Sequence, residues 1–292
     1  MDLSNKRVLF LGDSITHDGQ YVGFIEYALR KQKPEQNFDF YSLGLNSETA
    51  SGLSENDHPF PRPCIHERLG SALGKIKPEV VFVCYGMNDG IYHPLNKDIF
   101  DAYKKGMLEL VKKCQNVGAE VILITPPLFQ DHAIPNLLQD AEAADFSYRA
   151  PYKAYQETLA AFSEWTSTAT PENVTCVNLN SIMATYVSDQ RKENKNFCFS
   201  KDGIHPSLEG HLFIAQVILK NLNFNHDVLS RGKLTELKKT PLYKLVEKRR
   251  QLRSRGWLKY VGYERAKVFK TDSISETELR VAELLKEIDV IT

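Results

Sequence analysis

The stretch VLFLGDSIT, residues 8–16, constrains the fold of this chain more than any other. Its first four residues are all apolar, as in a strand that is buried on both faces of a parallel sheet. The run ends at Gly12-Asp13-Ser14, and a helical pattern follows it. Open α/β sheets place their ligands at the carboxyl ends of strands, so we expect Ser14 at a functional edge. A Gly-Asp-Ser triplet also occurs in ordinary turns, so its meaning depends on partners farther along the chain.

Apolar runs and helical repeats alternate through the chain up to about residue 225. The short apolar runs predict strands, and the amphipathic segments between them predict helices. This alternation is typical of a parallel, doubly wound sheet with helices on both faces. Polar residues interrupt it at residues 42–53, and a proline-rich crossing follows at residues 58–63. The predicted strands are residues 7–12, 38–43, 80–84, 121–124 and 174–179, and the predicted helices are residues 21–33, 65–75, 97–116, 151–165 and 208–222.

The chain changes character after about residue 225. Strand patterns stop, and residues 231–270 hold fourteen Lys and Arg against three Asp and Glu, although the whole chain is neutral. Helical spacing of apolar residues continues, and Ser275 and Glu278 have the spacing of a capping box that would open a last helix. We therefore expect a main domain over residues 1–225 and a basic helical extension over residues 226–292. The extension would pack on the main domain or lie at a dimer contact.

Aromatic residues lie among the basic residues of this extension. Basic residues interleaved with aromatic ones can bind nucleic acid. A solvated helical face docked on the acidic main domain explains the same pattern, and we favour it, so no nucleic-acid partner is expected. The aromatic residues in question are Tyr243, Trp257, Tyr260 and Tyr263.

Cysteine usage and hydropathy bear on the compartment. The amino terminus has no apolar signal region, and no apolar run is long enough to span a bilayer. We expect a cytoplasmic protein without a membrane partner, with export left open for a chain whose signal was removed. No histidine spacing resembles a ligand motif, so no metal or other cofactor is expected. The five scattered cysteines are typical of reduced thiols: Cys64, Cys84, Cys114, Cys176 and Cys198.

Two further motifs offer what Ser14 would need to act as a nucleophile. Ester hydrolysis through a serine requires a base, a group that orients the base, and donors for the oxyanion. His205 can be neutral near pH 7, and Asp202 precedes it by three residues on a turn that Gly203 permits. Asn88 follows the third predicted strand and carries an uncharged N–H donor. The residues therefore predict an ester hydrolase in which the backbone N–H of Ser14 also faces the oxyanion.

The three motifs, in this order and spacing, resemble blocks I, III and V of the SGNH (GDSL) hydrolase family. The residues concerned are Gly12-Asp13-Ser14, Gly86-Met87-Asn88-Asp89 and Asp202-x-x-His205, and the resemblance spans roughly residues 5–222. It implies a flavodoxin-like, three-layer α/β/α sandwich with a parallel five-stranded sheet. It also implies Ser14 as nucleophile, Asp202 and His205 as the other members of the triad, and Asn88 in the oxyanion hole.

The family's second block, which supplies a glycine N–H to the oxyanion hole, is irregular here. The corresponding stretch is SLGLNSET, residues 42–49. Gly44 matches the first glycine of the block, and Ser47 stands where the second belongs. The donor is a backbone N–H, which serine also has, so we expect Ser47 as the donor and keep Gly44 as the alternative.

The residues around the predicted site are polar and aromatic, and no long apolar lid is evident. This suits a small acyl group, such as acetyl, on a polar carrier such as a sugar. His17, Glu48, Asp89 and Tyr92 are the candidate substrate-binding residues. A lysophospholipase or thioesterase is the alternative within the family, and a non-catalytic module that binds carbohydrate or nucleic acid is the alternative outside it. A homo-oligomer is compatible with the sequence.

Overall fold

A parallel sheet of five strands forms the centre of the molecule. In this computed structural model, residues 1–169, 171, 174–262 and 270–292 are described; Tyr263 lies outside them. The strands are β1 (Arg7–Gly12), β2 (Asp39–Gly44), β3 (Val80–Cys84), β4 (Glu120–Ile124) and β5 (Val174–Val177), in the order β2-β1-β3-β4-β5. All neighbouring strands are parallel, so their carboxyl ends share one edge. The predicted α/β class and five-stranded parallel sheet are confirmed.

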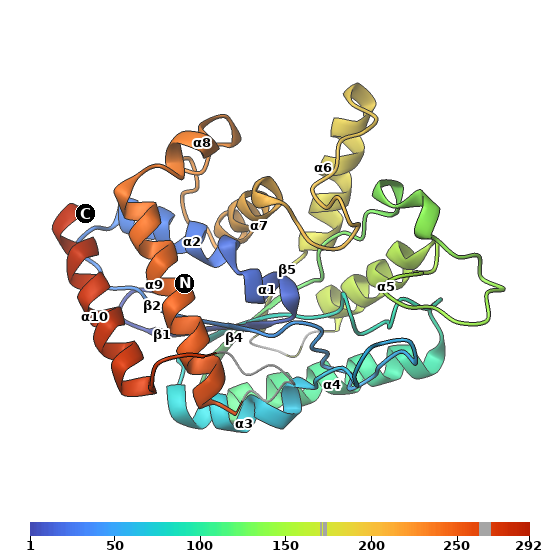
Figure 1. The fold of residues 1–292 in the computed structure, drawn as a ribbon, viewed down its shortest axis with the longest axis horizontal. Helices are drawn as coiled ribbons and strands as arrows, with labels where there is room; N and C mark the ends of the chain where they lie inside the picture. The colour runs from blue at the N-terminus through green and yellow to red at the C-terminus, as the bar shows by residue number, and fades with distance from the viewer. Residues whose placement is uncertain (170, 172–173, 263–269) are drawn as a thin grey trace.

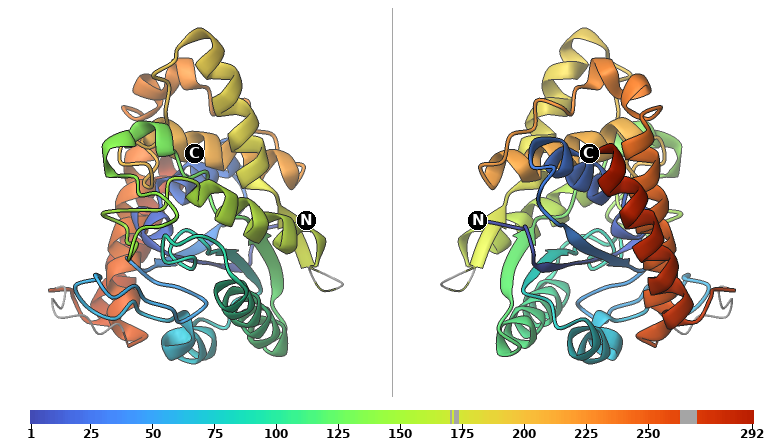
Figure 2. Two further views of the ribbon diagram at one scale, coloured as in Figure 1. Left: turned by 90° about the vertical axis from the view of Figure 1, so that its right-hand side faces the viewer. Right: turned by 90° about the vertical axis from the view of Figure 1, so that its left-hand side faces the viewer.

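Helices cover both faces of the sheet and make it the middle layer of three. One face carries α3 (Ile65–Ile76) and α4 (Lys97–Asn116), below the sheet in Figure 1. The opposite face carries α2 (Gln20–Gln32) and α7 (Leu208–Asn221), which pack on each other (Figure 2). Residues of β1 and β3 are almost completely buried between these layers, as their apolar runs predict.

The remaining helices of the main domain flank the sheet. α5 (Tyr155–Thr168) packs against α4 through Phe162, which stacks on Tyr103 at 4.0 Å between ring centroids. α6 (Leu179–Glu193) contacts α5 and α7. Short 3-10 turns occupy residues 131–133, 135–137 and 231–233.

The helix predicted over residues 21–33 corresponds to α2, and a separate short helix precedes it. α1 (Ser14–Asp18) starts directly after β1, and Gly19 separates it from α2. Gly19 has φ +62°, a conformation that glycine adopts without steric cost, and a Cβ there would lie 2.7 Å from the Thr16 carbonyl oxygen. This kink keeps Ser14 on a short helix of its own, beside the end of β2.

One helix was not predicted from the sequence, and the start of another was misplaced. The segment that forms α6 was not predicted as a helix, because only Leu179, Asn180, Met183 and Val187 of its residues are buried. The capping box of the last helix was placed two residues too late. The structure has it at Ser273 and Glu276, where the Ser273 hydroxyl accepts from the Glu276 N–H and the Glu276 carboxylate accepts from the Ser273 N–H.

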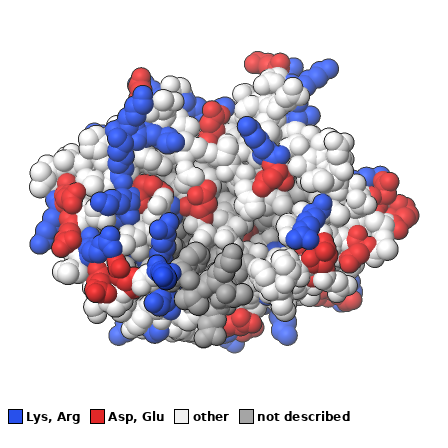
Figure 3. All heavy atoms as spheres, viewed as in Figure 1, with Lys and Arg blue, Asp and Glu red and all other residues white. Residues whose placement is uncertain are grey.

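The extension consists of α8 (Leu234–Leu237), α9 (Pro241–Tyr260) and α10 (Ile274–Ile291). α9 lies along α2 and the edge strand β2, and α10 packs on α9. The arginines of the inner face of α9 are buried, whereas Lys244, Lys248, Arg255 and Lys259 are exposed on its outer face. Figure 3 shows Lys and Arg gathered along α9.

Two further observations concern the described residues only. No helix among them is both long enough and apolar enough to cross a bilayer. All five cysteines are free thiols, and Cys84 is buried in β3, as its apolar surroundings predict.

Candidate active site

The sheet topology brings the three sequence motifs to one edge. Gly12, at the end of β1, pairs in register with Gly44 of β2 and with Cys84 of β3. The chain segments that follow these strands therefore start side by side, and they carry Ser14, Ser47 and Asn88. The loop before α7 brings Asp202 and His205 to the same edge, because His205 contacts Ser14.

Ser14, His205 and Asp202 form a continuous chain of hydrogen bonds. The Ser14 Oγ lies 2.8 Å from His205 Nε2, and His205 Nδ1 lies 2.7 Å from Asp202 Oδ2. Carboxylate oxygens only accept, so Nδ1 carries the proton and a neutral imidazole presents Nε2 to the hydroxyl as an acceptor. This is the tautomer that a general base for Ser14 requires.

Local hydrogen bonds hold the Asp202 carboxylate in place. Its Oδ1 accepts from the backbone N–H of Ile204 at 3.0 Å and of His205 at 2.8 Å. Partial burial works to raise the pKa of Asp202, but the hydrogen bonds from His205 and Ile204 outweigh it and lower that pKa to about 2. The carboxylate is therefore ionised at neutral pH.

The same contact acts on His205. The hydrogen bond to Asp202 raises the pKa of His205 above its ordinary value, against the effect of desolvation. The side chains of His205 and Asp202 are 51% and 55% exposed, so solvent and a substrate can reach them.

Asp13 has a structural place beside Ser14. Its carboxylate is buried and accepts from the Ile15 N–H at 2.9 Å, which caps the amino terminus of α1. Burial raises the pKa of Asp13 to about 7, in spite of that hydrogen bond. This position gives Asp13 a structural role in the turn around Ser14.

Ser47 occupies a backbone conformation that normally requires glycine. Its φ is +68°, and the Glu48 N–H bonds the Leu45 carbonyl at 3.1 Å, so residues 45–48 form a turn with Ser47 at the position that favours glycine. This conformation explains why a family pattern would hold glycine here. Gly44 instead lies inside β2, and a Cβ on it would come within 2.1 Å of the His17 backbone nitrogen. Close packing against α1 accounts for that glycine.

Asn88 is held from both ends of its side chain. Its Nδ2 donates to the Glu48 carbonyl oxygen at 3.2 Å, and its Oδ1 accepts from the Tyr92 hydroxyl at 3.1 Å. The amide nitrogen has two hydrogens, and the Glu48 carbonyl uses one of them. Asn88 and Tyr92 are both nearly fully buried, so the orientation of the amide is fixed by packing as well as by hydrogen bonds.

Glu48 and Asp89, expected as substrate-binding residues, have buried carboxylates with partners inside the protein. Glu48 accepts two hydrogen bonds of 2.6 Å from the Arg68 guanidinium and one of 2.5 Å from the Tyr85 hydroxyl. Asp89 accepts from the N–H groups of Ala50 and Ser51 at 2.8 and 2.7 Å. Both side chains therefore hold the loop after β2, and the expectation that they face a substrate was wrong.

His17 and Tyr92, the other two candidates, differ in access. His17 is partly exposed, and its Nδ1 lies 3.0 Å from the Gly44 carbonyl oxygen. Tyr92 is 1% exposed and stacks on Tyr155 at 4.8 Å between ring centroids. Tyr92 thus orients Asn88 from inside the protein, whereas the side chain of His17 is partly exposed to solvent.

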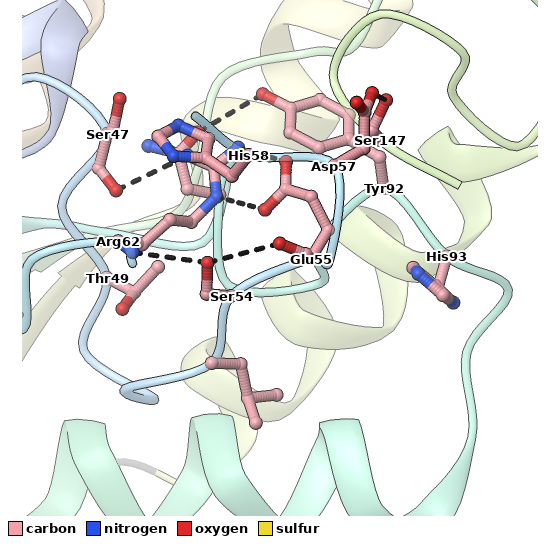
Figure 4. Close-up of polar contacts among 12 residues, drawn as sticks. Ser47, Thr49, Ser54, Glu55, Asp57, His58, Arg62, Tyr92, His93 and Ser147 are labelled. Carbon is pink, nitrogen blue, oxygen red and sulfur yellow. Dashed lines mark hydrogen bonds and ion pairs between the residues drawn. The ribbon is translucent and has the colours of Figure 1, made fainter. Parts of the chain in front are cut away.

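Sequence reasoning missed several residues that support these loops. Gln130, after β4, bonds the backbone N–H of Phe199 and the hydroxyl of Ser200, next to the loop of Asp202. Arg62 and Glu55 form a buried ion pair beside Ser47 (Figure 4). These contacts join residues from different loops, so no spacing in the sequence announces them. The three prolines around Arg62 were the only local signal, since they indicate a rigid segment.

The residues that the structure describes also lack the ligand set of a metal site. No group of three or more His, Cys, Asp or Glu side chains there could hold a metal ion.

The chain is similar to one protein family and to several solved structures. The GDSL-like lipase/acylhydrolase family matches residues 10–212, whereas no curated protein matches the chain. A gut microbial diltiazem-metabolizing enzyme, BT4096, has a TM-score of 0.57 at 20% identity over 77% of this chain. The match covers 48% of that enzyme, so the chain spans about half its length.

Two smaller structures are matched over nearly their whole length. A catalytic mutant of Axe2, an acetylxylan esterase from Geobacillus stearothermophilus, has a TM-score of 0.55 at 19% identity, over 76% of this chain and 96% of Axe2. LAE5, an alpha/beta hydrolase enzyme from the metagenome of Lake Arreo in Spain, has a TM-score of 0.54 at 19% identity, over 76% of this chain and 97% of LAE5. At such identities these structures support the fold, and the family match covers well over half of the chain. The chain therefore belongs to the GDSL-like lipase/acylhydrolase family of ester hydrolases.

Proposed function

We propose that this protein hydrolyses esters of small acyl groups through a Ser14–His205–Asp202 triad. One observation carries the proposal: hydrogen bonds of 2.8 and 2.7 Å link the Ser14 hydroxyl, the His205 imidazole and the Asp202 carboxylate. Nucleophile, base and orienting group are thus within reach of one another without any rearrangement.

The reaction has two halves. Ser14 Oγ attacks the carbonyl carbon of the ester while His205 Nε2 takes the hydroxyl proton, and the carbonyl oxygen becomes an oxyanion. The oxyanion collapses, and the alcohol leaves with the proton from His205, so the acyl group stays on Ser14. Water then attacks the acyl-enzyme with His205 again as the base, and the acid is released. Asp202 keeps the imidazole in the required tautomer and stabilises its charged form.

Three N–H groups are proposed as donors to the oxyanion. They are the backbone N–H of Ser14, the backbone N–H of Ser47 and the second N–H of the Asn88 amide. The geometry favours Ser47 over Gly44, because Ser47 lies in the turn beyond β2 whereas Gly44 is inside the strand, paired with Gly12. A preorganised donor of this kind typically contributes about 10²–10³-fold to kcat.

The proposed substrate is an O-acetylated carbohydrate. Aromatic rings gather where residues 58–60 meet residues 147–149: His58 lies 4.6 Å from Phe60 and 5.6 Å from Tyr148 between ring centroids. Ser147 donates to Asp57 at 2.9 Å and ties the two loops together. Phe60 is exposed and the other two rings are partly exposed, and rings of this kind can stack on sugar rings while the polar side chains beside them bond to hydroxyl groups. Axe2, a protein of similar fold, is an acetylxylan esterase, and that activity is compatible with this class.

A direct test compares p-nitrophenyl acetate hydrolysis by the wild type and by Ser14→Ala. We expect a loss of about 10³-fold or more, together with a fluorophosphonate adduct on Ser14 of the wild type. Equal rates would reject the triad. A series of acyl lengths and O-acetylated sugars tests the substrate, and a preference for long acyl chains would favour a lysophospholipase or thioesterase instead.

A further inference from the structure

A single buried guanidinium contacts both loops that carry the proposed oxyanion donors. Arg62 Nη1 donates to the Ser47 carbonyl oxygen at 3.3 Å, and the Arg62 Cζ lies 5.6 Å from the centroid of the Tyr92 ring. Tyr92 in turn bonds the Asn88 amide. We propose that Arg62, held by Glu55, is a positioning residue that fixes the two donor loops relative to each other. The proposal rests on the function proposed above.

The first contact of Arg62, with the Ser47 carbonyl oxygen, acts on the Ser47 backbone. A non-glycine residue at φ +68° is in a conformation that costs free energy relative to ordinary backbone, because its Cβ is crowded. Neighbouring contacts oppose relaxation of this turn: Arg62 holds the carbonyl of Ser47, and Asn88 Nδ2 holds the carbonyl of Glu48 at 3.2 Å. The two peptide groups that follow Ser47 are held in this way, so Ser47 keeps its positive φ. The Ser47 N–H therefore keeps one direction.

The second contact of Arg62, with the Tyr92 ring, acts on Asn88 through Tyr92. The cation faces the Tyr92 ring on one side, while Tyr155 stacks on the ring at 4.8 Å. Tyr92 itself has φ +62°, so its backbone is also strained and needs neighbours that hold it. The ring that orients the Asn88 amide is therefore fixed by Arg62 and Tyr155 together.

Glu55 explains why an arginine can be buried here. Its two carboxylate oxygens accept from Arg62 Nε and Nη2 at 2.5 Å each, and the two side chains are 0% and 2% exposed. The backbone N–H of Arg62 also donates to the Ser54 hydroxyl at 3.1 Å. The planar fork leaves Nη1 to reach Ser47, as Figure 4 shows. A lysine keeps the charge but cannot make the paired contact and the Ser47 contact at once.

The test is a pair of substitutions with a double-mutant cycle. We expect Arg62→Lys and the isosteric Glu55→Gln each to lower kcat for p-nitrophenyl acetate by about 10²-fold, with little change in KM, because the donors are misplaced for the transition state. In a Ser47→Gly background the loss should be about tenfold smaller, since glycine adopts the positive φ without external support. A structural role alone would give no such rescue.

Arg253→Lys is the matched control. Arg253 also forms a paired contact with a glutamate, Glu278, and lies 3.7 Å from the centroid of a tyrosine ring, Tyr41, but on α9, in the extension. We expect it to lower the unfolding temperature and leave kcat of the folded protein unchanged. Should Arg62→Lys fail to fold, Glu55→Gln carries the same test.

The outcomes separate the two proposals. A wild type no faster than Ser14→Ala rejects the proposed function. A wild type that depends on Ser14, with Arg62→Lys and Glu55→Gln both folded and close to wild-type kcat, rejects the positioning role alone. Equal losses with and without Ser47→Gly also overturn it.

Discussion

At the scale of single residues, the protonation of His205 sets the pH range of the proposed reaction. The base must be neutral to accept the Ser14 proton, so kcat/KM should rise with pH as His205 loses its proton. The hydrogen bond to Asp202 raises the pKa of His205, so we expect the midpoint of this rise above about 6.5, the ordinary value. A profile of kcat/KM against pH measures it directly.

Asp202→Asn serves as the comparison for that profile. The amide does not carry the charge that raises the pKa of His205, so the midpoint should move to lower pH. The turnover itself should fall by about 10⁴-fold, because the orientation and tautomer of the imidazole are lost. A midpoint that stays in place in this variant would show that Asp202 does not control His205.

Asn88 and Tyr92 lead to a graded prediction. Asn88→Ala removes a proposed donor and should lower kcat by about 10²–10³-fold with little change in KM. Tyr92→Phe removes only the hydroxyl that bonds Asn88 Oδ1 at 3.1 Å, so its effect should be about tenfold or less. Steady-state kinetics of the two variants, side by side, check the order. A larger loss in Tyr92→Phe than in Asn88→Ala would place the essential donor elsewhere.

At the scale of helices and strands, local patterns predicted the elements whose apolar residues form a continuous run or one clear helical face. The helix expected over residues 97–116 and the strand over residues 80–84 have the same bounds as α4 and β3. α6 was missed because its buried face is short. The break between α1 and α2 at Gly19 was not predicted, because it depends on contacts with Thr16 and Arg250 that no local pattern reveals.

The residues of the candidate site also differ in how far the sequence predicts them. The meeting of the segments that carry Ser14, Asn88 and His205 could be predicted, because motifs at strand ends of a parallel sheet lie at one edge. Glu48 could not be assigned, because adjacency to a motif does not tell which way a side chain points. Its carboxylate turns inward to Arg68, a residue twenty positions away.

The contact between α2 and α9 offers a stability prediction. Glu26 on α2 accepts from Arg30 at 2.8 Å and from Arg249 of α9 at 3.1 Å, and all three side chains are almost fully buried. Glu26→Gln leaves two buried guanidinium groups with less negative charge between them. Removing one member of a buried ion pair costs about 3–5 kcal/mol, which denaturant unfolding would measure.

A surface pair is the control for that measurement. The Glu79 carboxylate lies 3.8 Å from the Arg7 guanidinium and accepts from the Arg7 backbone N–H at 3.0 Å, and both side chains are about half exposed. Glu79→Gln should change the free energy of unfolding by about 0–1 kcal/mol. Equal effects of Glu26→Gln and Glu79→Gln would mean that the buried network contributes no more than a surface contact.

At the scale of the whole molecule, the basic extension divides its charge between two faces. Its inward arginines pair with acidic residues of the main domain and of α10: Arg249 with Glu26, and Arg253 with Asp39 and Glu278. The outward lysines of α9 are exposed. The pairs account for how so basic a segment packs against the rest of the chain.

Aromatic packing is the second kind of contact between the extension and the main domain. Tyr243 of α9 stacks on Phe24 at 5.0 Å and meets the edge of Tyr27 at 6.1 Å, and Trp257 lies edge-on to Tyr41 at 5.1 Å between ring centroids. These partners come from α2 and from β2, the strand that leads to the Ser47 turn. A chain that ends at residue 225 would expose them to water and remove the guanidinium groups that face Asp39.

We therefore expect residues 1–225 alone to be poorly soluble, or to unfold at least about 10 °C below the full chain. A chain that ends at residue 272 is the matched comparison, because it loses α10 and keeps α9 on α2 and β2; its unfolding temperature should lie between the two. Thermal unfolding and p-nitrophenyl acetate turnover of the three chains measure this. If residues 1–225 keep both the full unfolding temperature and the full turnover, the extension is an independent unit, and its contacts with α2 and β2 contribute nothing to the fold of the site.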